Sequence, residues 1–416
     1  MTNESTTQID APRLLAQSLE LPCGAVLSNR LAKAAMAEAM GTASGAPTAE
    51  LERLYRRWAA GGSGLLITGN VMIDPAAMGE PNDVVVEDDR HLEALARWAR
   101  AARSDRTAAW VQINHPGRQS MSPDPVAPSA VPLAMGHGVF KKPRALTEAE
   151  IKGIIARFAR TAAVVQQAGF DGVQIHGAHG YLISQFLSPR TNQRDDAWGG
   201  SLDNRMRFLL EIVAAIREAV GAGFPIGVKL NSADFQRGGF TEDESLAVVR
   251  ALEAAGIDLL EISGGTYEAA AMMGSVKTQK ESTRQREAYF LDYARKVRQE
   301  VKLPLMLTGG FRTAEGMASA LAEGAIDVVG LARPLALEPD LPARLLSGEA
   351  RRSEMRAPKA IGHRMLDDLV GLAWYQQQLQ RMGRGLEPDP ERSSWLVLAC
   401  QLLVMGPSLL ARTRSR

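Results

Sequence analysis

Short apolar runs recur along the chain, and they lack the strict alternation of apolar and polar residues that marks a half-exposed strand. Such continuous runs are typical of strands buried on both faces, as in a parallel sheet. Segments with helical periodicity separate the runs. The pattern predicts eight strands, at residues 31–36, 64–68, 109–113, 172–176, 225–230, 258–262, 304–308 and 327–331.

Two of the intervening helices are marked by their first residues. Thr147 and Glu150 form a predicted capping box, in which each side chain satisfies a free backbone N–H group of the first turn. Apolar residues follow at helical spacing, and Gly169 supplies the stop. Thr241 and Glu244 repeat this signal before a second helix.

Eight strands separated by helices, over about 300 residues, predict an α/β fold of the (β/α)8 TIM barrel type. A doubly wound open sheet is the alternative, but no G-x-G-x-x-G motif follows a predicted strand. We expect residues 1–349 to form the barrel, with a Pro- and Gly-rich insertion at 115–146. Residues 350–416 are expected to form a C-terminal helical extension that packs on the barrel or at a subunit interface.

Composition narrows the class of protein. The 416 residues include 48 Lys and Arg against 47 Asp and Glu, and the net charge of +1 gives no reason to expect nucleic acid as a partner. The only cysteines, Cys23 and Cys400, exclude a disulfide framework and an iron–sulfur cluster. Residues 1–12 do not resemble a signal peptide, and the longest apolar stretch, 395–410, is interrupted and too short to span a bilayer. We therefore expect a cytoplasmic enzyme without a membrane span.

The end of the fourth predicted strand carries the densest candidate chemistry, because active sites of such barrels lie where the strands end. His176, His179 and Tyr181 fall within six residues there. Imidazoles can donate hydrogen bonds to an oxygen that becomes negative during reaction, and a phenol can deliver a proton. Zinc binding and satisfaction of loop backbone groups are the alternatives, although no third zinc ligand of suitable spacing is evident.

The third and fifth strand ends add an amide and a charge. Gln112 offers both a donor and an acceptor, which suits a flat heterocycle with adjacent carbonyl and N–H groups. Lys229 must direct its charge to a partner carboxylate or to a ligand that accumulates negative charge, and the sequence favours neither.

The seventh and eighth strand ends predict a phosphate site. Gly309 and Gly310 lack side chains, so backbone N–H groups can approach an anion. Ala332 and Arg333 follow strand eight, where Arg333 adds a guanidinium. Barrels often hold a phosphate between these two loops. The residues alone therefore predict a phosphorylated planar cofactor, either flavin mononucleotide (FMN) or pyridoxal phosphate with Lys229 as its lysine.

An extended motif begins at the end of the fourth strand. From His176 it reads HGAHGYLISQFLSPRTN, and from Asp196 it continues DAWGGSLDNR. This run resembles that of the Old Yellow Enzyme family, the NADH:flavin oxidoreductases, and is highly specific to it. The resemblance covers residues 10–345, with further matches at Asn29-Arg30, Gln112 to Arg118, Ile262 to Gly265, Thr308 to Gly310 and Ala332-Arg333.

The resemblance implies an FMN-binding barrel enzyme without an iron–sulfur cluster. NADH or NADPH would reduce FMN, and flavin N5 would pass the hydride to the β-carbon of an electron-poor alkene, a small-molecule substrate. His176 and His179 would hydrogen-bond the substrate's carbonyl or nitro oxygen, and Tyr181 would protonate the α-carbon. The implied flavin contacts are Gln112 at the pyrimidine edge, Lys229 near N1 and O2, Ala35, Met36, Ala37 and Gly69 along the ring, and Gly309, Gly310, Ala332 and Arg333 at the phosphate.

One position departs from the family pattern. Many members carry Cys or Thr where this chain has Ala37, and that side chain hydrogen-bonds the flavin. Alanine cannot donate such a bond, so we expect a lower flavin potential than in those relatives.

Other functions remain compatible with the same residues. They are a flavin oxidoreductase or demethylase acting on another substrate, a flavin-binding redox sensor, and a zinc hydrolase. A sensor needs no proton donor, so the set formed by His176, His179 and Tyr181 argues against it. We expect loops at 119–143, 232–240 and 266–286 to select the substrate. NADH and NADPH are not distinguished, and the apolar segment 395–403 is a candidate interface for a homo-oligomer.

Overall fold

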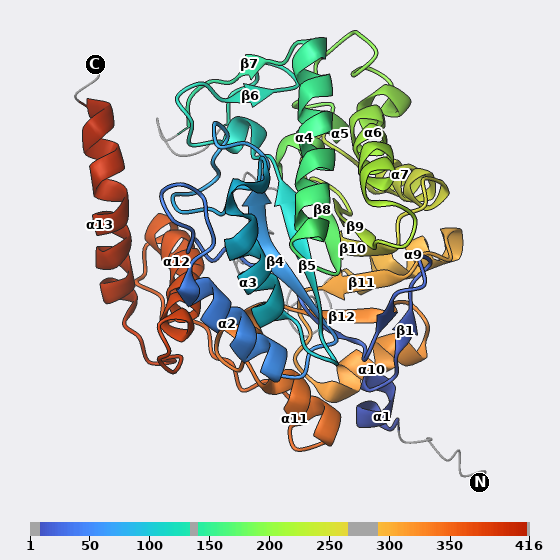
Figure 1. Cartoon of the computed structure of the whole chain (residues 1–416), viewed down its shortest axis with the longest axis vertical. Coiled ribbons are helices and arrows are strands. Elements are labelled where there is room, and N and C mark those ends of the chain that lie inside the picture. Colours follow the sequence, from blue (N-terminus) through green and yellow to red (C-terminus); the bar gives the residue numbers. More distant parts are fainter. Residues whose placement is uncertain (1–8, 134–139, 265–289, 414–416) are drawn as a thin grey trace.

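Eight parallel strands close into a barrel surrounded by helices (Figure 1). The computed structural model describes residues 9–133, 140–264 and 290–413. The strands follow one another around the barrel, and the last pairs with the first through Val329 and Leu31. The barrel strands are β3 (Leu31–Lys33), β4 (Leu65–Met72), β5 (Ala108–Asn114), β8 (Gly172–Gly177), β9 (Ile226–Asn231), β10 (Leu259–Ser263), β11 (Leu305–Thr308) and β12 (Val328–Leu331). Every predicted strand is present, and the predicted (β/α)8 TIM barrel is confirmed.

Helices follow each barrel strand and cover its outer face. Both predicted capping boxes are present, with Thr147 and Glu150 opening one helix and Thr241 and Glu244 opening another. The α-helices of the barrel layer are α1 (Ala11–Leu15), α2 (Ala49–Ala60), α3 (Leu92–Ala102), α4 (Glu148–Gln167), α5 (Leu182–Leu187), α6 (Leu202–Val220), α7 (Glu242–Ala254), α9 (Leu291–Glu300), α10 (Ala314–Ala322) and α11 (Leu341–Ser347), and the 3-10 turns are η1 (Asp89–His91), η2 (Gly117–Gln119) and η3 (Arg333–Ala336).

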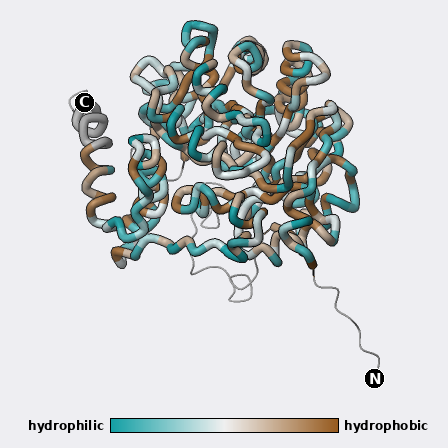
Figure 2. Tube along the Cα trace, turned by 60° about the horizontal axis from the view of Figure 1, so that its bottom comes forward, coloured by the Kyte–Doolittle hydropathy of each residue, from teal (hydrophilic) through white to brown (hydrophobic). Residues whose placement is uncertain are grey.

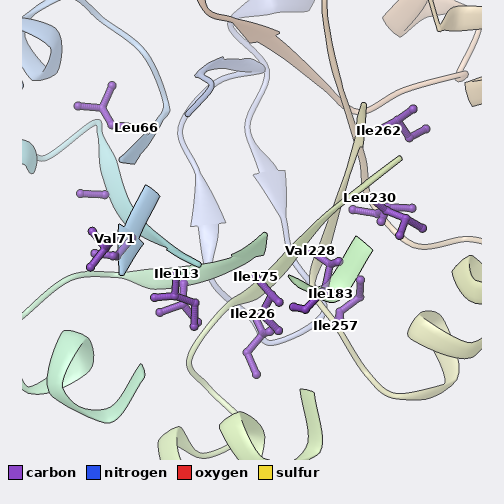
Figure 3. Packing of buried hydrophobic residues seen from close by; sticks show 14 of the residues in the cluster. Leu66, Val71, Ile113, Ile175, Ile183, Ile226, Val228, Leu230, Ile257 and Ile262 are labelled. Carbon is purple, nitrogen blue, oxygen red and sulfur yellow. The ribbon is translucent and has the colours of Figure 1, made fainter. Parts of the chain in front are cut away.

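The continuous apolar runs of the strands have a simple explanation, because each strand is buried on both faces. Outward-facing residues such as Ile113, Ile175 and Val228 gather between strands and helices (Figure 3). Inward-facing residues form a second apolar cluster in the lower part of the barrel, where the Trp110 ring is 1% exposed. A Cβ atom at Gly172 or Gly227 would lie under 3.0 Å from that ring, so these glycines make room for Trp110.

A short hairpin closes the amino-terminal end of the barrel. Strands β1 (Leu19–Glu20) and β2 (Val26–Leu27) pair antiparallel, and Leu21 and Leu27 belong to the inner apolar cluster. The bottom of the barrel is therefore a packed core, and the opposite end is left to carry the site.

Two regions depart from the repeat. The predicted insertion carries η2 and two short strands, β6 (Val126–Ala127) and β7 (Arg144–Ala145), which pair in parallel. The tail forms α12 (Arg364–Gly383) and α13 (Ser394–Thr413). Helix α12 packs against α2 with Trp374 fully buried, and α13 lies at the edge of the molecule beside α12 (Figure 1). The division of the chain at residue 349 stays a prediction.

Hydrophobic residues recur along the described part of α13 (Figure 2). Trp395, Leu396, Leu402 and Leu403 are exposed there, whereas Val397 and Leu398 are buried. Among the helices in the described ranges, none has the length and apolar character needed to cross a membrane.

Candidate functional site

On several strands, including β5 and β10, the inward-facing residues change from apolar to polar toward the carboxyl end. Trp110 is followed on the same face of β5 by Gln112 and Asn114, and Leu259 is followed on β10 by Glu261 and Ser263. Further inward-facing polar residues line the carboxyl ends of the strands: Gln174, His176, Lys229, Asn231 and Thr308. The candidate site therefore lies at the carboxyl ends of the strands, as expected for this fold.

The three predicted catalytic residues come together above β8. His176 is the penultimate residue of the strand, and His179 and Tyr181 follow in a turn where His179 and Gly180 adopt φ values of 60° and 76°. The His176 ring lies edge-on to the rings of His179 and Tyr181, with centroids 5.1 and 4.8 Å away. This turn brings an imidazole and a phenol into contact with the His176 ring.

Burial of the two imidazoles favours their neutral forms. Burial lowers the pKa of His176 well below its ordinary value, and the nearby His179 and Lys229 lower it further. Burial and the charge of Lys229 have the same effect on the pKa of His179. A neutral imidazole has one N–H donor and one acceptor. His176 Nδ1 accepts from the backbone N–H of Ala178 at 3.3 Å, so its proton resides on Nε2.

Neighbouring strands hold His179 in place. Its Nε2 lies 2.8 Å from Ser263 Oγ at the end of β10, and its backbone N–H donates to Asn231 Oδ1 on β9 at 3.2 Å. If the Ser263 hydroxyl donates to Nε2, then Nδ1 of His179 carries the proton. Gln119 Nε2 donates to the His179 carbonyl at 3.0 Å, which ties the insertion to the same turn.

Gln112 and Lys229 are the two ends of a buried polar network. Gln112 Nε2 donates to Gln174 Oε1, and Gln174 Nε2 donates to Glu261 Oε2, both at 2.7 Å. Lys229 Nζ lies 2.9 Å from Glu261 Oε1. Lys229 therefore has the partner carboxylate that the sequence left open, and its charge is balanced within the barrel.

Segment 35–37, which is expected to line the flavin ring, lies between two buried charges. Lys33 Nζ donates to the Ile67 carbonyl at 2.7 Å and lies 3.9 Å from Glu38 Oε1. Glu38 accepts from the Gly69 backbone N–H at 3.0 Å and from the Tyr55 hydroxyl. Burial lowers the pKa of Lys33 to about 8, and the Glu38 charge opposes this shift. Burial also raises the pKa of Glu38.

Gly69 has a packing reason to be glycine. A Cβ atom there would lie 2.0 Å from Glu38 Oε2 and 2.4 Å from the Met36 carbonyl oxygen. Gly69 thus lets β4 pass close to segment 35–37, whose residues are half-buried at the barrel mouth. A contact between Gly69 and the flavin stays a prediction.

The predicted phosphate residues lie side by side because β11 and β12 are paired through Thr308 and Gly330. Gly309 and Gly310 have φ values of 122° and 90°, which L side chains rarely adopt, and they present their backbone at the mouth. Arg333 is exposed, and its Cζ lies 5.4 Å from the ring centroid of Tyr375 on α12.

Unpaired buried polar atoms support a polar ligand at this end. Among the described residues, neither Nδ2 nor Oδ1 of Asn114 has a hydrogen-bond partner, and neither does Thr308 Oγ1. Leaving such atoms unsatisfied in the folded protein costs free energy, which a ligand with donors and acceptors recovers. The positive-φ glycines and Arg333 suit a phosphate, and Gln112 suits the edge of a heterocycle. The residues present fit FMN.

A metal centre receives no support from the described side chains. Within residues 9–133, 140–264 and 290–413, no three His, Cys, Asp or Glu residues are grouped so as to hold a metal ion. The predicted substrate loop 266–286 lies outside the described residues, as do positions 134–139 of loop 119–143. In loop 232–240, Phe235 has a φ of 55° and stacks on Phe290 with centroids 6.3 Å apart.

Five residues that support the site were not predicted from the sequence: Gln174, Glu261, Ser263, Lys33 and Glu38. The available signal was a polar residue inside an otherwise apolar strand, as in Val173-Gln174-Ile175 and Leu260-Glu261-Ile262. Such residues must find partners when buried. The identity of the partner depends on the closure of the barrel, which a single run of residues does not reveal.

Comparison with known proteins agrees with this geometry. The sequence model of the NADH:flavin oxidoreductase / NADH oxidase family matches residues 23–352. The NADH-dependent flavin oxidoreductase iliE of Hypocrea jecorina is 42% identical over 356 residues, which is 79% of this chain and 88% of that protein.

The solved structures that share the fold include two at 26% sequence identity. A 2-naphthoyl-CoA reductase in complex with 2-naphthoyl-CoA superposes with a TM-score of 0.79 over 90% of this chain and 58% of its own. An old yellow enzyme homologue from Zymomonas mobilis gives a TM-score of 0.68 over 82% of this chain and 94% of its own.

Proposed function

Because the chain belongs to the NADH:flavin oxidoreductase / NADH oxidase family, we propose that it reduces the double bond of an electron-poor alkene. The chain is an FMN-dependent oxidoreductase that uses NADH or NADPH. The proposal adds the acceptor, an alkene conjugated to a carbonyl or nitro group, and the source of the proton, Tyr181.

When bound, FMN supplies the hydride that reaches the β-carbon of the alkene, and NAD(P)H supplies the hydride to FMN. The α-carbon must then take a proton, so that the C=C bond gains two electrons and two hydrogens. Tyr181 is the candidate donor, since its phenol ring packs edge-on against the His176 ring.

The histidines are suited to bind the substrate oxygen as neutral donors. His176 can offer Nε2–H, because Nδ1 is occupied by the Ala178 backbone N–H. Donors aimed at an oxygen that gains negative charge lower the barrier most when they are already fixed in place. Ser263 and Asn231 fix His179, and contact with His179 and Tyr181 fixes His176.

The observation that carries the proposal is the contact between Tyr181 and His176, 4.8 Å between ring centroids, beside a second neutral imidazole. A proton donor next to two oxygen-binding groups serves a substrate that must be polarised and protonated. A protein that only stores or senses electrons has no use for this combination.

The first test follows the visible spectrum of the purified protein. We expect flavin absorbance to bleach when the protein is titrated anaerobically with NADH or NADPH, and to return on addition of 2-cyclohexenone. Bleaching without recovery, with a panel of enones and nitroalkenes, would refute alkene reduction while leaving the oxidoreductase intact.

The Tyr181→Phe variant tests the proton donor. Loss of a positioned general acid slows a step by about 10²- to 10⁴-fold, so we expect reoxidation by the enone to slow by that factor. Reduction by NADH should keep its wild-type rate, because it needs no proton from Tyr181. Tyr293→Phe is the matched control, since Tyr293 is also buried but donates to Ser245 in the helix layer. Equal enone rates in the two variants would remove Tyr181 from the mechanism.

A further inference from the structure

Glu261 lies at the centre of a network whose two ends are the residues expected to meet the pyrimidine edge of FMN. It is fully buried on β10, with Lys229 on β9 as its register partner. Gln174 on β8 is the register partner of Gln112 on β5 and is also fully buried. Four strands thus contribute one polar side chain each to a single chain of contacts.

Glu261 determines which residue donates and which accepts in each hydrogen bond of this network. A carboxylate accepts hydrogen bonds and cannot donate them. Glu261 Oε2 therefore takes the N–H of Gln174, which turns the Gln174 oxygen toward Gln112. Gln112 must in turn present its Nε2 to Gln174, so its own oxygen is directed to the other side. A planar amide has two orientations, and the Glu261 carboxylate, as an obligatory acceptor, selects one of them for each glutamine.

The Glu261 carboxylate also limits how strongly the positive charge of Lys229 can stabilise negative charge on a ligand. Its Oε1 lies 2.9 Å from Lys229 Nζ, so the ammonium and the carboxylate form a buried ion pair. In a water-poor interior, charges act on each other strongly, and a paired ammonium stabilises a developing negative charge less than an unpaired one.

We propose that Glu261 is a positioning residue, which orients the Gln112 amide for FMN through Gln174 and lowers the flavin potential by balancing the charge of Lys229. This role rests on the proposed placement of the flavin edge at Gln112 and Lys229. It assigns two separable effects to one side chain, one on affinity through Gln174 and one on potential through Lys229.

The effect on potential is tested with Glu261→Gln, which keeps the shape and removes the charge. The unpaired Lys229 should favour the reduced, more negative flavin. We expect the ratio of affinities for reduced and oxidised FMN to rise about tenfold, which corresponds to a midpoint potential about 30 mV higher for a two-electron couple. An unchanged midpoint would overturn the charge effect.

Asp258→Asn is the matched control. Asp258 precedes β10 at the opposite end of the barrel, is buried, and pairs with Arg217 at 2.7 Å. Removing this charge also breaks an ion pair, here a partly buried one, so both variants should lose stability. Only Glu261→Gln should change the midpoint, and an equal change in Asp258→Asn would reduce the role of Glu261 to folding.

Gln174→Met tests the orientation effect independently and leaves the Lys229–Glu261 pair intact. We expect the dissociation constant of oxidised FMN to rise about tenfold, as for loss of a buried hydrogen bond, with the midpoint at its wild-type value. An unchanged dissociation constant would overturn the orientation effect. Wild-type protein that takes up no FMN would defeat the flavin placement itself, whereas flavin-loaded variants with unchanged properties would defeat only the role of Glu261.

Discussion

Lys33 shows how one buried side chain can support a site without entering it. Its ammonium bonds the Ala34 and Ile67 carbonyls at 3.2 and 2.7 Å, lies 4.5 Å from the Trp58 ring centroid, and faces Glu38. These contacts hold the chain on both sides of segment 35–37. Burying an ion pair of this kind costs free energy that its contacts only partly recover.

We expect this cost to make stability rise with pH above about 8. Unfolding returns the pKa of Lys33 from about 8 to its ordinary 10.5. Between these values the unfolded chain binds more protons than the folded chain, so the free energy of unfolding increases with pH, by about 3 kcal/mol at most. The measurement is urea unfolding across this pH range.

The reference is the double variant Lys33→Met/Glu38→Gln, which has neither charge. Titration of groups remote from this pair cancels when its unfolding free energy is subtracted from that of the wild type. The difference should rise from pH 8 to pH 10.5, and a constant difference would show that Lys33 titrates normally in the folded protein.

Ala37 carries a second prediction. It is half-buried at the mouth between Met36 and Glu38, where a cysteine side chain could donate to the flavin. Ala37→Cys should raise the midpoint potential, because a net hydrogen bond of about 0.5–1.5 kcal/mol to the reduced flavin corresponds to about 10–30 mV. Ala37→Val fills similar space without a donor and should leave the potential unchanged. A midpoint that does not move in Ala37→Cys would refute the idea.

Site residues that lie close together in the sequence could be predicted to form one cluster. Contacts between site residues that depend on closure of the barrel could not be predicted. His176, His179 and Tyr181 occupy one short turn, so their proximity was visible in the order of residues. Glu261 reaches Gln174 over 87 positions, and only the circular arrangement of strands brings the two together. The partner of Lys229 was undecidable for the same reason.

Helix α12 connects the tail to the predicted phosphate site. Tyr375 is buried, and its ring faces Arg333, while Gln376 donates to Glu80 at 2.9 Å. The charges of Arg333 and Arg312 partly oppose the effect of burial, which raises the pKa of Tyr375. The ring thus contacts the exposed guanidinium of Arg333 from α12.

Tyr375→Leu should weaken FMN binding. A cation–π contact at an exposed site contributes about 0.5–1 kcal/mol, which predicts a two- to five-fold rise in the dissociation constant. Binding of riboflavin, which lacks the phosphate, should be unaffected, and Tyr375→Phe should behave as the wild type. Equal losses for FMN and riboflavin would show that Tyr375 supports the fold and has no specific effect on the phosphate.

The barrel strands were predictable because each is apolar on both faces, whereas the short pairs were not. Strands β1, β2, β6 and β7 have two residues each, and Val26 is 60% exposed. No periodicity can be read from two residues. Their pairing depends on contacts with the barrel bottom and the insertion, which are distant in the sequence.

Along the barrel axis, the residues that stabilise the fold and the residues of the candidate site lie at opposite ends. Apolar residues and the β1–β2 hairpin fill the lower part, and polar networks line the mouth. Substitutions such as Trp110→Ala at the bottom should therefore lower stability first, whereas substitutions at the mouth should change flavin properties with smaller effects on folding.

The exposed apolar face of α13 gives the last prediction. The exposed residues form two pairs seven positions apart, Trp395 with Leu402 and Leu396 with Leu403, and so lie in one stripe along the helix. Residues 394–410 contain no charged side chain. A stripe of this kind on a helix can pair with its copy about a two-fold axis, which removes the apolar surface from water. We expect the protein to sediment as a dimer or larger species. Leu402→Glu/Leu403→Glu should shift it to a monomer with an unchanged flavin spectrum, because α13 packs beside α12 and lies at the edge of the molecule (Figure 1). A wild-type monomer, or a double variant of wild-type size, would show that α13 serves no self-association.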